Sequence, residues 1–173
     1  FAGMFVYVLS APVFLIEHLG LSAAQFGWLF VPLTAGMMLG AALSGRLAGK
    51  LSPRRTVAVA YAAMTTAATI NLMIGLSAPS SIAWYLLPLP LYTAGMSLAM
   101  PSLTLIALDR FPARRGLAAA VQGLMNTGAA GLSAGLLVPL LWGSPLTLAL
   151  GMALLLAAGA IAFTLSVRTA RIR

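Results

Sequence analysis

The stretch from Gly45 to Arg55 constrains the fold more than any other part of the sequence. It holds four of the ten Lys and Arg residues, and long apolar runs flank it on both sides. Placing one such cation at the centre of a bilayer costs about 2.5–3.5 kcal/mol on insertion scales. The apolar residues of a modestly hydrophobic span cannot offset the insertion cost of four cations, so we predict that this stretch is a loop in water. Short loops that are rich in Lys and Arg stay in the cytoplasm, which predicts the side of the membrane as well.

The uncharged intervals of the sequence predict how often the chain crosses a membrane. One crossing needs about 20 apolar residues. The interval 19–45 has room for one crossing, whereas 56–108 and 117–167, with 53 and 51 uncharged residues, each have room for two. We therefore predict an all-α membrane protein whose single domain, residues 1–173, is a six-transmembrane-helix bundle. The predicted spans are residues 1–16, 24–45, 56–76, 82–108, 117–141 and 146–167.

The distribution of basic residues predicts the orientation of these spans. The loops after the first, third and fifth spans contain no Lys or Arg, and the segments after the second, fourth and sixth contain all ten. Both ends of this multi-pass segment are therefore expected in the cytoplasm. The chain starts at Phe1, and no charged region precedes the first apolar run, which argues against a cleavable signal peptide. We expect the chain to be a fragment of a longer protein.

Composition excludes several classes of function. The mean hydropathy is +1.03 and only 7% of the residues are charged, as in a membrane protein whose main partner is the lipid bilayer. The net charge of +8 is confined to short loops between apolar runs, so nucleic acid is not expected as a partner. Without cysteine, disulfides, zinc–thiolate sites and iron–sulfur clusters are ruled out. We expect no metal and no cofactor.

An enzyme is also disfavoured by the sequence. Residues 131–135 match the G-x-S-x-G pattern of a nucleophile elbow, but that elbow needs a preceding strand and a base within reach. Here the serine falls within an apolar helix, and the sole histidine, His18, is near the other end of the chain. A stripe of small residues that packs against a neighbouring helix explains the pattern better. Two such stripes are predicted: Gly36, Gly40 and Ser44 on the second span, and Gly123, Thr127, Gly131 and Gly135 on the fifth.

Neither carboxylate of the sequence is predicted to lie at membrane depth. Glu17 falls at the outer end of the first span and Asp109 at the start of an inner loop, where it is expected to pair loosely with a neighbouring Arg. Proton-driven transport usually needs a carboxylate or histidine inside the membrane. The group that drives transport is therefore not expected among these residues.

Uncharged polar residues within the spans are the candidates for binding a small-molecule substrate. Gln122 and Asn126 share one face of the fifth span because they are four residues apart. Two interpretations are open for such residues: helix–helix hydrogen bonding or gap-filling, and the lining of a central cavity for a mixed, partly apolar ligand. Asn71 is a weaker candidate, since the other residues of its span are mostly small and suit an outer position in the bundle. The other candidates are Tyr7 and Ser10 on the first span and Tyr92 and Met96 on the fourth.

Several short motifs lie in or beside the predicted spans: residues 7–12, 20–22 and 25–27, and later Met100–Pro101, Phe111–Pro112 and Gly116–Ala120. Together with the order of spans and loops, these motifs resemble one half of a major facilitator superfamily transporter, specifically the second half of Bcr/CflA-type drug exporters. The first three motifs are similar to the seventh helix and the loop after it, and the last three to the tenth helix and the following loop. The resemblance covers essentially the whole chain.

The basic stretch that opens at Gly45 is similar to the second copy of the inner-loop motif of that superfamily. Lys50 and Arg54 keep basic positions of the motif, and Arg55 follows them. The motif has an Asp four residues after its Gly, whereas this chain has Gly49 there. The departure weakens any role for this loop as a charge relay in gating.

The resemblance implies a function that the residues alone do not establish. It implies proton-coupled efflux of drugs or small amphipathic metabolites from the bacterial inner (plasma) membrane, by a twelve-helix antiporter of which this segment is the second half. The partner would be the N-terminal half of the same transporter, which would also carry the coupling carboxylate. Two alternatives stay open: a superfamily member that moves sugars or other metabolites, and a six-span protein that assembles or binds partners without transport.

Overall fold

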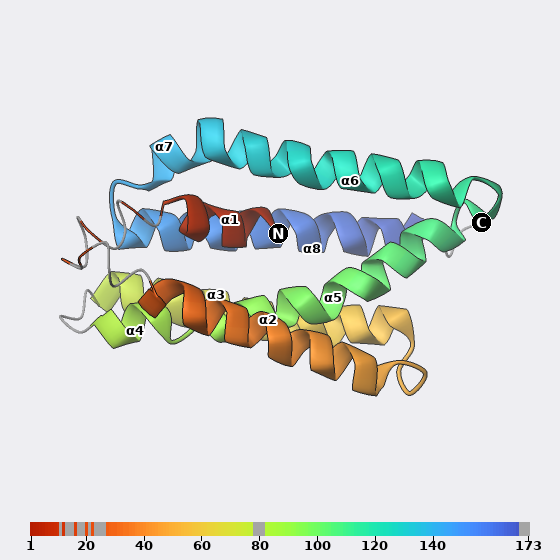
Figure 1. The fold of residues 1–173 in the computed structure, drawn as a ribbon, viewed down its shortest axis with the longest axis horizontal. Helices are drawn as coiled ribbons and strands as arrows, with labels where there is room; N and C mark the ends of the chain where they lie inside the picture. The colour runs from red at the N-terminus through yellow and green to blue at the C-terminus, as the bar shows by residue number, and fades with distance from the viewer. Residues whose placement is uncertain are drawn as a thin grey trace.

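The computed structural model describes residues 1–10, 12, 16, 20, 22, 27–77 and 82–169, and these form an all-helical bundle without strands. Figure 1 shows the long helices lying side by side along the longest axis of the molecule. The elements are α1 (Ala2–Leu9), α2 (Gly27–Leu47), α3 (Pro53–Ser77), α4 (Ile82–Leu86), α5 (Leu89–Asp109), the 3₁₀ helix η3 (Pro112–Arg114), α6 (Arg115–Leu132), the π-helix η4 (Ser133–Leu137), α7 (Val138–Leu141) and α8 (Pro145–Thr169).

Five segments of the described chain are long and apolar enough to cross a membrane. They correspond to the second to sixth predicted spans, and α1 is the described part of the first. Residues 11 and 13–15 of that first span, Glu17 after it, and the predicted start of the second span at residue 24 lie outside the described residues. The five segments are Leu29–Leu47, Pro53–Ser77, Trp84–Asp109, Pro112–Leu141 and Pro145–Val167.

Two of the spans are interrupted where the sequence places proline or glycine. A turn at Leu87 and Pro88 separates α4 from α5, because Pro88 and Pro90 remove backbone donors from the helical ladder. The fifth span changes from α6 into the π-helix η4 and resumes as α7, which has a proline, Pro139, in its first turn. A bundle tolerates such breaks because neighbouring helices satisfy the freed backbone groups.

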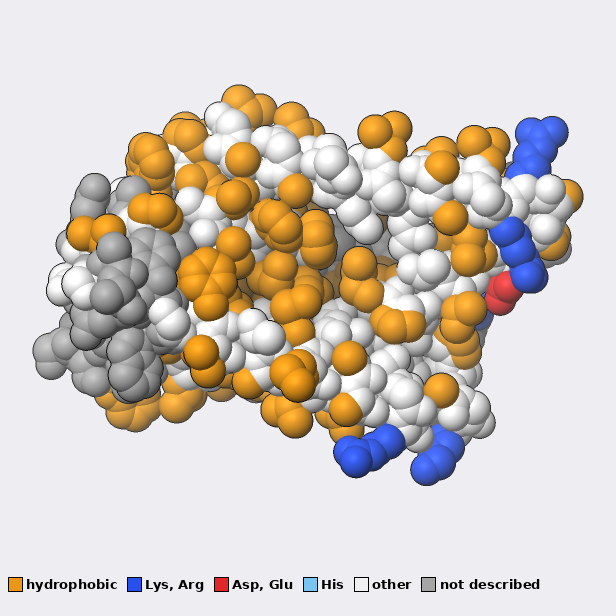
Figure 2. Space-filling view, viewed as in Figure 1, with side chains coloured by type: hydrophobic (Ala, Val, Ile, Leu, Met, Phe, Trp, Pro, Cys, Tyr) orange, Lys and Arg blue, Asp and Glu red, His pale blue; other side chains and the backbone are white. Residues whose placement is uncertain are grey.

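Helix α5 is the centre of the bundle. It packs most extensively against α2 and α3, while α8 packs against α3 and α1. The main core contains Val6, Leu29, Leu148 and Met152, which are fully buried. The α2–α3 and α5–α6 loops lie at the same end of the molecule, and Figure 2 shows the visible Lys and Arg side chains there. The structure thus gathers at one end two of the basic segments that the sequence assigns to one side of the membrane.

The small-residue stripe of the second span is a close helix–helix seam, as predicted. A Cβ atom on Gly36 would overlap the Pro90 carbonyl oxygen of α5, and one on Gly40 would overlap that of Ala94. At the same seam the Thr93 hydroxyl donates a hydrogen bond of 3.0 Å to the Leu33 carbonyl oxygen. Without side chains on the two glycines, the backbones of α2 and α5 approach closely enough for this interhelical bond.

The predicted packing stripe of the fifth span is wrong for contacts within the described chain. Gly123, Gly131 and Gly135 are exposed, and a Cβ atom on any of them would meet nothing within 4 Å. The reason is that α6 turns the opposite side, which carries the half-buried Gln122 and Asn126, toward the bundle. No residue of α6 itself is buried, so the glycines face outward.

Candidate functional site

The six predicted substrate-binding residues fall in three places of the fold. Tyr7 and Ser10 lie in the interior of the bundle, Tyr92 and Met96 line a small cavity, and Gln122 lines a larger groove at the basic end. Asn126 follows Gln122 one turn later on the same side of α6. The structure therefore keeps the three sequence pairs but does not unite them in one site.

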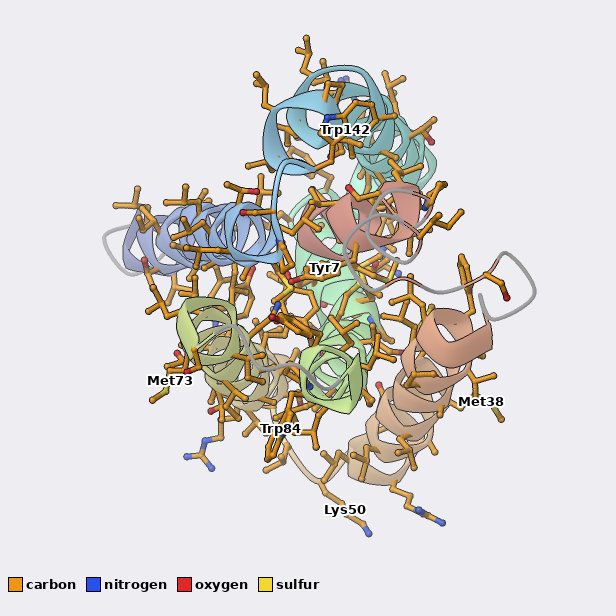
Figure 3. The ribbon with its side chains drawn as sticks, turned by 90° about the vertical axis from the view of Figure 1, so that its left-hand side faces the viewer. Tyr7, Met38, Lys50, Met73, Trp84 and Trp142 are labelled. Carbon is orange, nitrogen blue, oxygen red and sulfur yellow. The ribbon has the colours of Figure 1, made fainter. Side chains whose placement is uncertain are left out.

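Tyr7 belongs to a buried hydrogen-bonded pair that joins two helices. Its side chain on α1 is 2% exposed, and its phenol oxygen accepts a hydrogen bond of 2.5 Å from the Asn71 side-chain amide on α3. Figure 3 shows Tyr7 near the middle of the helices, far from the outward-pointing Lys50. The expectation of an outer position for Asn71 is wrong: this side chain is also 2% exposed, because an amide in hydrocarbon needs a partner and α1 supplies it.

Ser10 is fully buried at the end of α1, and its Oγ has no hydrogen-bond partner in the described part of the chain. With Tyr7 it lies in the packed interface between helices rather than on an open surface. Tyr7 therefore joins α1 to α3, whereas the Ser10 hydroxyl adds no hydrogen bond within the described chain.

The cavity that contains Tyr92 and Met96 lies among α1, α3, α5 and α8 and has a volume of about 170 Å³. Three methionines, Met64, Met96 and Met100, contribute flexible thioether side chains to its wall. The phenols of Tyr61 and Tyr92 supply its polar groups. The Tyr92 hydroxyl comes so close to Gly3 of α1 that any side chain at that position would displace it.

The groove that contains Gln122 lies between α5 and α6 and has a volume of about 520 Å³. Gln122 spans it at one place, where its Nε2 donates a hydrogen bond of 2.9 Å to the Thr104 hydroxyl of α5. Figure 2 shows the surface hollowed between α6 and the helices beneath it. The groove is lined by Leu103, Ala107, Phe111, Arg114, Leu117, Ala118, Val121, Gln122 and Met125.

The chemistry of this groove suits a mixed ligand. Its walls are apolar, the Arg114 guanidinium stands at the basic end, and the Gln122 amide offers both a donor and an acceptor. The Asn126 side chain is half-buried and makes no hydrogen bond within the described chain, so a second amide is available one turn further along α6. Pockets of this kind bind a ligand mainly by burying apolar surface, and a few polar groups provide the specificity. No group of three or more His, Cys, Asp or Glu residues able to hold a metal occurs among the described residues.

The inner-loop motif forms the tight connection between α2 and α3. Gly45, Lys50, Arg54 and Arg55 are all exposed. Gly49 has a φ of 77°, and the backbone N–H of Leu51 bonds back to the Leu47 carbonyl oxygen at 3.1 Å. A left-handed residue that closes a helix C-terminus is most often glycine. The local turn thus accounts for the glycine that stands where the related motif has an acid.

Two long-range hydrogen bonds near the groove and its basic end were not predicted by the sequence analysis. Thr104 is the partner of Gln122, and the pair lies nine residues on either side of residue 113, in the loop that joins α5 to α6. Such symmetry is expected for antiparallel neighbours joined by a short loop and could have identified Thr104. Arg110 donates a hydrogen bond of 3.0 Å to the Ser166 carbonyl oxygen of α8, a long-range contact with no local signal.

Comparison with known proteins gives a family match and two distant relatives. The family model described as Major Facilitator Superfamily matches residues 1–134, ending within η4. Two proteins named "Multidrug transporter MdfA", from Edwardsiella piscicida and from Edwardsiella tarda (strain FL6-60), are each 26% identical over 123 residues. These residues are 71% of this chain but only 30% of either relative, so the chain matches less than a third of their length. No solved structure matches significantly.

Proposed function

Because this chain belongs to the major facilitator superfamily, we propose that it forms the second, six-helix half of a twelve-helix transporter that exports drugs or small amphipathic metabolites in exchange for protons. The family match carries the proposal, since it covers residues 1–134 and so includes both walls of the α5–α6 groove. The printed name of the two relatives, multidrug transporter, supports export of chemically varied compounds.

The first half of the transporter is the proposed partner of this segment. The outward glycines of α6 and exposed apolar side chains such as that of Met38 on α2 form surfaces that a second bundle would cover. The carboxylate that couples transport to protons is also assigned to that half. The only described carboxylate here, Asp109, is exposed in an inner loop and lies 3.4 Å from Arg115.

The proposed site is the α5–α6 groove, with Gln122 and Asn126 as the groups that discriminate among substrates. In the full-length transporter, Asn126→Ala is expected to change the relative affinities of dissimilar compounds by about two- to 13-fold, since one hydrogen bond contributes about 0.5–1.5 kcal/mol. Gln122→Ala should also lower the free energy of unfolding by about 0.6 kcal/mol because it removes the bond to Thr104. Efflux assays on several compounds and thermal unfolding of the purified variants check these values.

Thr127→Ala is the matched control for the groove. Thr127 neighbours Asn126 in sequence but is exposed on the outward side of α6, so its substitution should leave the order of substrate affinities unchanged. A uniform fall in efflux of all compounds that tracks reduced thermal stability would mean that the amides serve packing alone. That result would refute the proposed site.

We further propose the bacterial inner membrane as the location, with the α2–α3 loop in the cytoplasm. The segment has no cysteine, so Ser52→Cys and Gly143→Cys, both at exposed positions, can be introduced singly into a cysteine-free full-length protein. In intact cells, a membrane-impermeant thiol reagent is expected to label Gly143→Cys and to leave Ser52→Cys unlabelled until the cells are opened. The reverse pattern would invert the topology.

A further inference from the structure

The charges of the α2–α3 connection are unbalanced within the described part of this chain. This connection, which we call the basic loop, comprises residues 46–55 and carries Arg46, Lys50, Arg54 and Arg55. All four side chains are exposed, and none of them makes a hydrogen bond or an ion pair within the described part of the chain. The loop itself contains no acid, and the sequence has only two carboxylates in total.

The second basic loop provides an internal comparison. There Arg110 donates to the Ser166 carbonyl oxygen at 3.0 Å, and Arg115 lies 3.4 Å from the Asp109 carboxylate. Two of the three cations in that loop thus have partners inside the protein. The basic loop differs in that its four cations are directed away from the bundle, as Figure 3 shows for Lys50.

The depth of the basic loop follows from the apolar residues beside it. Leu43 on α2 precedes Arg46 by three residues, and Val59 on α3 follows Arg55 by four; both side chains are strongly exposed. At 1.5 Å per residue, these lipid-facing side chains lie only about 5–6 Å along the helix axes from the charges. The cations therefore lie at the level of the phospholipid headgroups, immediately outside the hydrocarbon.

The start of α3 adds donors to the same place. Pro53 begins the helix, and the N–H groups of Arg54 and Arg55 belong to its first turn, which has no preceding turn to accept them. The first N–H that bonds back is that of Thr56, to the Ser52 carbonyl oxygen at 3.0 Å. Backbone donors at a helix N-terminus favour an anion, and here they lie beside two guanidinium groups, which can bind phosphate through two parallel hydrogen bonds.

We propose that the basic loop is a binding site for the phosphate headgroup of an anionic phospholipid in the cytoplasmic leaflet, with Lys50, Arg54 and Arg55 as its main ligands. The phosphodiester would bind the two guanidinium groups at the start of α3, and the acyl chains would lie along the exposed apolar sides of α2 and α3. The lipid supplies an anion that the described part of this chain does not. This inference is independent of what the transporter carries.

Native mass spectrometry of the detergent-purified full-length transporter tests the proposal. Titration with phosphatidylglycerol and with phosphatidylcholine of the same acyl chains should show tighter binding of the anionic lipid. Each cation near an anionic surface is worth about a fivefold change in affinity, so Arg54→Gln should weaken phosphatidylglycerol binding about fivefold and R54Q/R55Q about 25-fold. Arg54→Lys, which keeps the charge, should stay within about threefold of the parent.

The matched control removes one cation from the same side of the membrane. Arg115→Gln deletes a charge that Asp109 already compensates, so it should change phosphatidylglycerol binding less than twofold. Free glycerol 3-phosphate at millimolar concentration should not displace the lipid, because the acyl chains contribute to binding. Equal binding of the two lipids, equal effects of Arg54→Gln and Arg115→Gln, or displacement by glycerol 3-phosphate would each overturn the proposal.

Discussion

Gly40→Leu is expected to prevent stable packing of α2 on α5, and Gly40→Ala to destabilise it in part. A Cβ atom at this position would overlap the Ala94 carbonyl oxygen and lie 2.9 Å from Ala94 Cα. The obstacle is backbone, which cannot rotate away, so the helices must separate and lose the bond between Thr93 and Leu33. Overpacking typically costs about 1–3 kcal/mol, and we expect Gly40→Ala near the upper limit and Gly40→Leu beyond it.

Gly45→Leu is the control for this prediction, since it makes the same substitution on the same helix. A Cβ atom on Gly45 would meet nothing within 4 Å, and leucine is a better helix former than glycine, so no loss of stability is expected. Thermal unfolding of the purified full-length proteins in one detergent measures the difference. Equal unfolding temperatures for Gly40→Leu and Gly45→Leu would show that α2 does not approach α5 through Gly40.

Tyr7→Phe is expected to lower the free energy of unfolding by about 0.6–1.7 kcal/mol, the range from the average to the maximum measured for hydrogen bonds inside membrane bundles. The substitution removes one oxygen atom and leaves the ring, so it creates no cavity. Asn71, which is 2% exposed and donates to that oxygen, then loses this acceptor in an apolar environment. Thermal or denaturant unfolding of the full-length protein gives the value.

Tyr92→Phe controls for the loss of a tyrosine hydroxyl. Tyr92 is equally buried, but its hydroxyl makes no hydrogen bond within the described chain, so its removal should cost less than Tyr7→Phe. A double variant, Tyr7→Phe with Asn71→Leu, should be less destabilised than the sum of its single variants, because both act on the same bond. Additive effects would argue against direct coupling of the two side chains.

The architecture was predictable from the sequence because charge and hydropathy act locally. Four uncompensated cations between apolar runs determine where a loop must lie, and intervals of about 50 uncharged residues determine two crossings each. The structure places the five long apolar segments within a few residues of the second to sixth predicted spans. The spacing of Gly36 and Gly40 likewise identified a face of α2 that can be approached closely, and α5 lies against it.

The partners of individual side chains were less predictable, because they depend on which helix lies beside which. The same spacing of small residues on α6 permits a close approach, yet no other part of the described chain meets it. Asn71 and Tyr7 are 64 residues apart, and nothing near either residue indicates the other. The polar candidates were recognisable by type alone, so the sequence could not separate buried hydrogen-bonding pairs from residues that line a groove.

The π-helix η4 changes the direction in which the residues after it face around the axis of the fifth span. A π-turn holds one residue more than an α-turn. At about 100° per residue, Val138 would lie about 160° around a regular helix from Gln122, and the additional residue reduces this angle to about 60°. The buried Val138 and the groove residue Gln122, which lies nearer the basic end, thus share one side of the fifth span. An alignment of this span with an uninterrupted helix consequently needs a one-residue gap at Ser133–Leu137. Without it, each position on one side of the gap is matched to a position about 100° away around the helix.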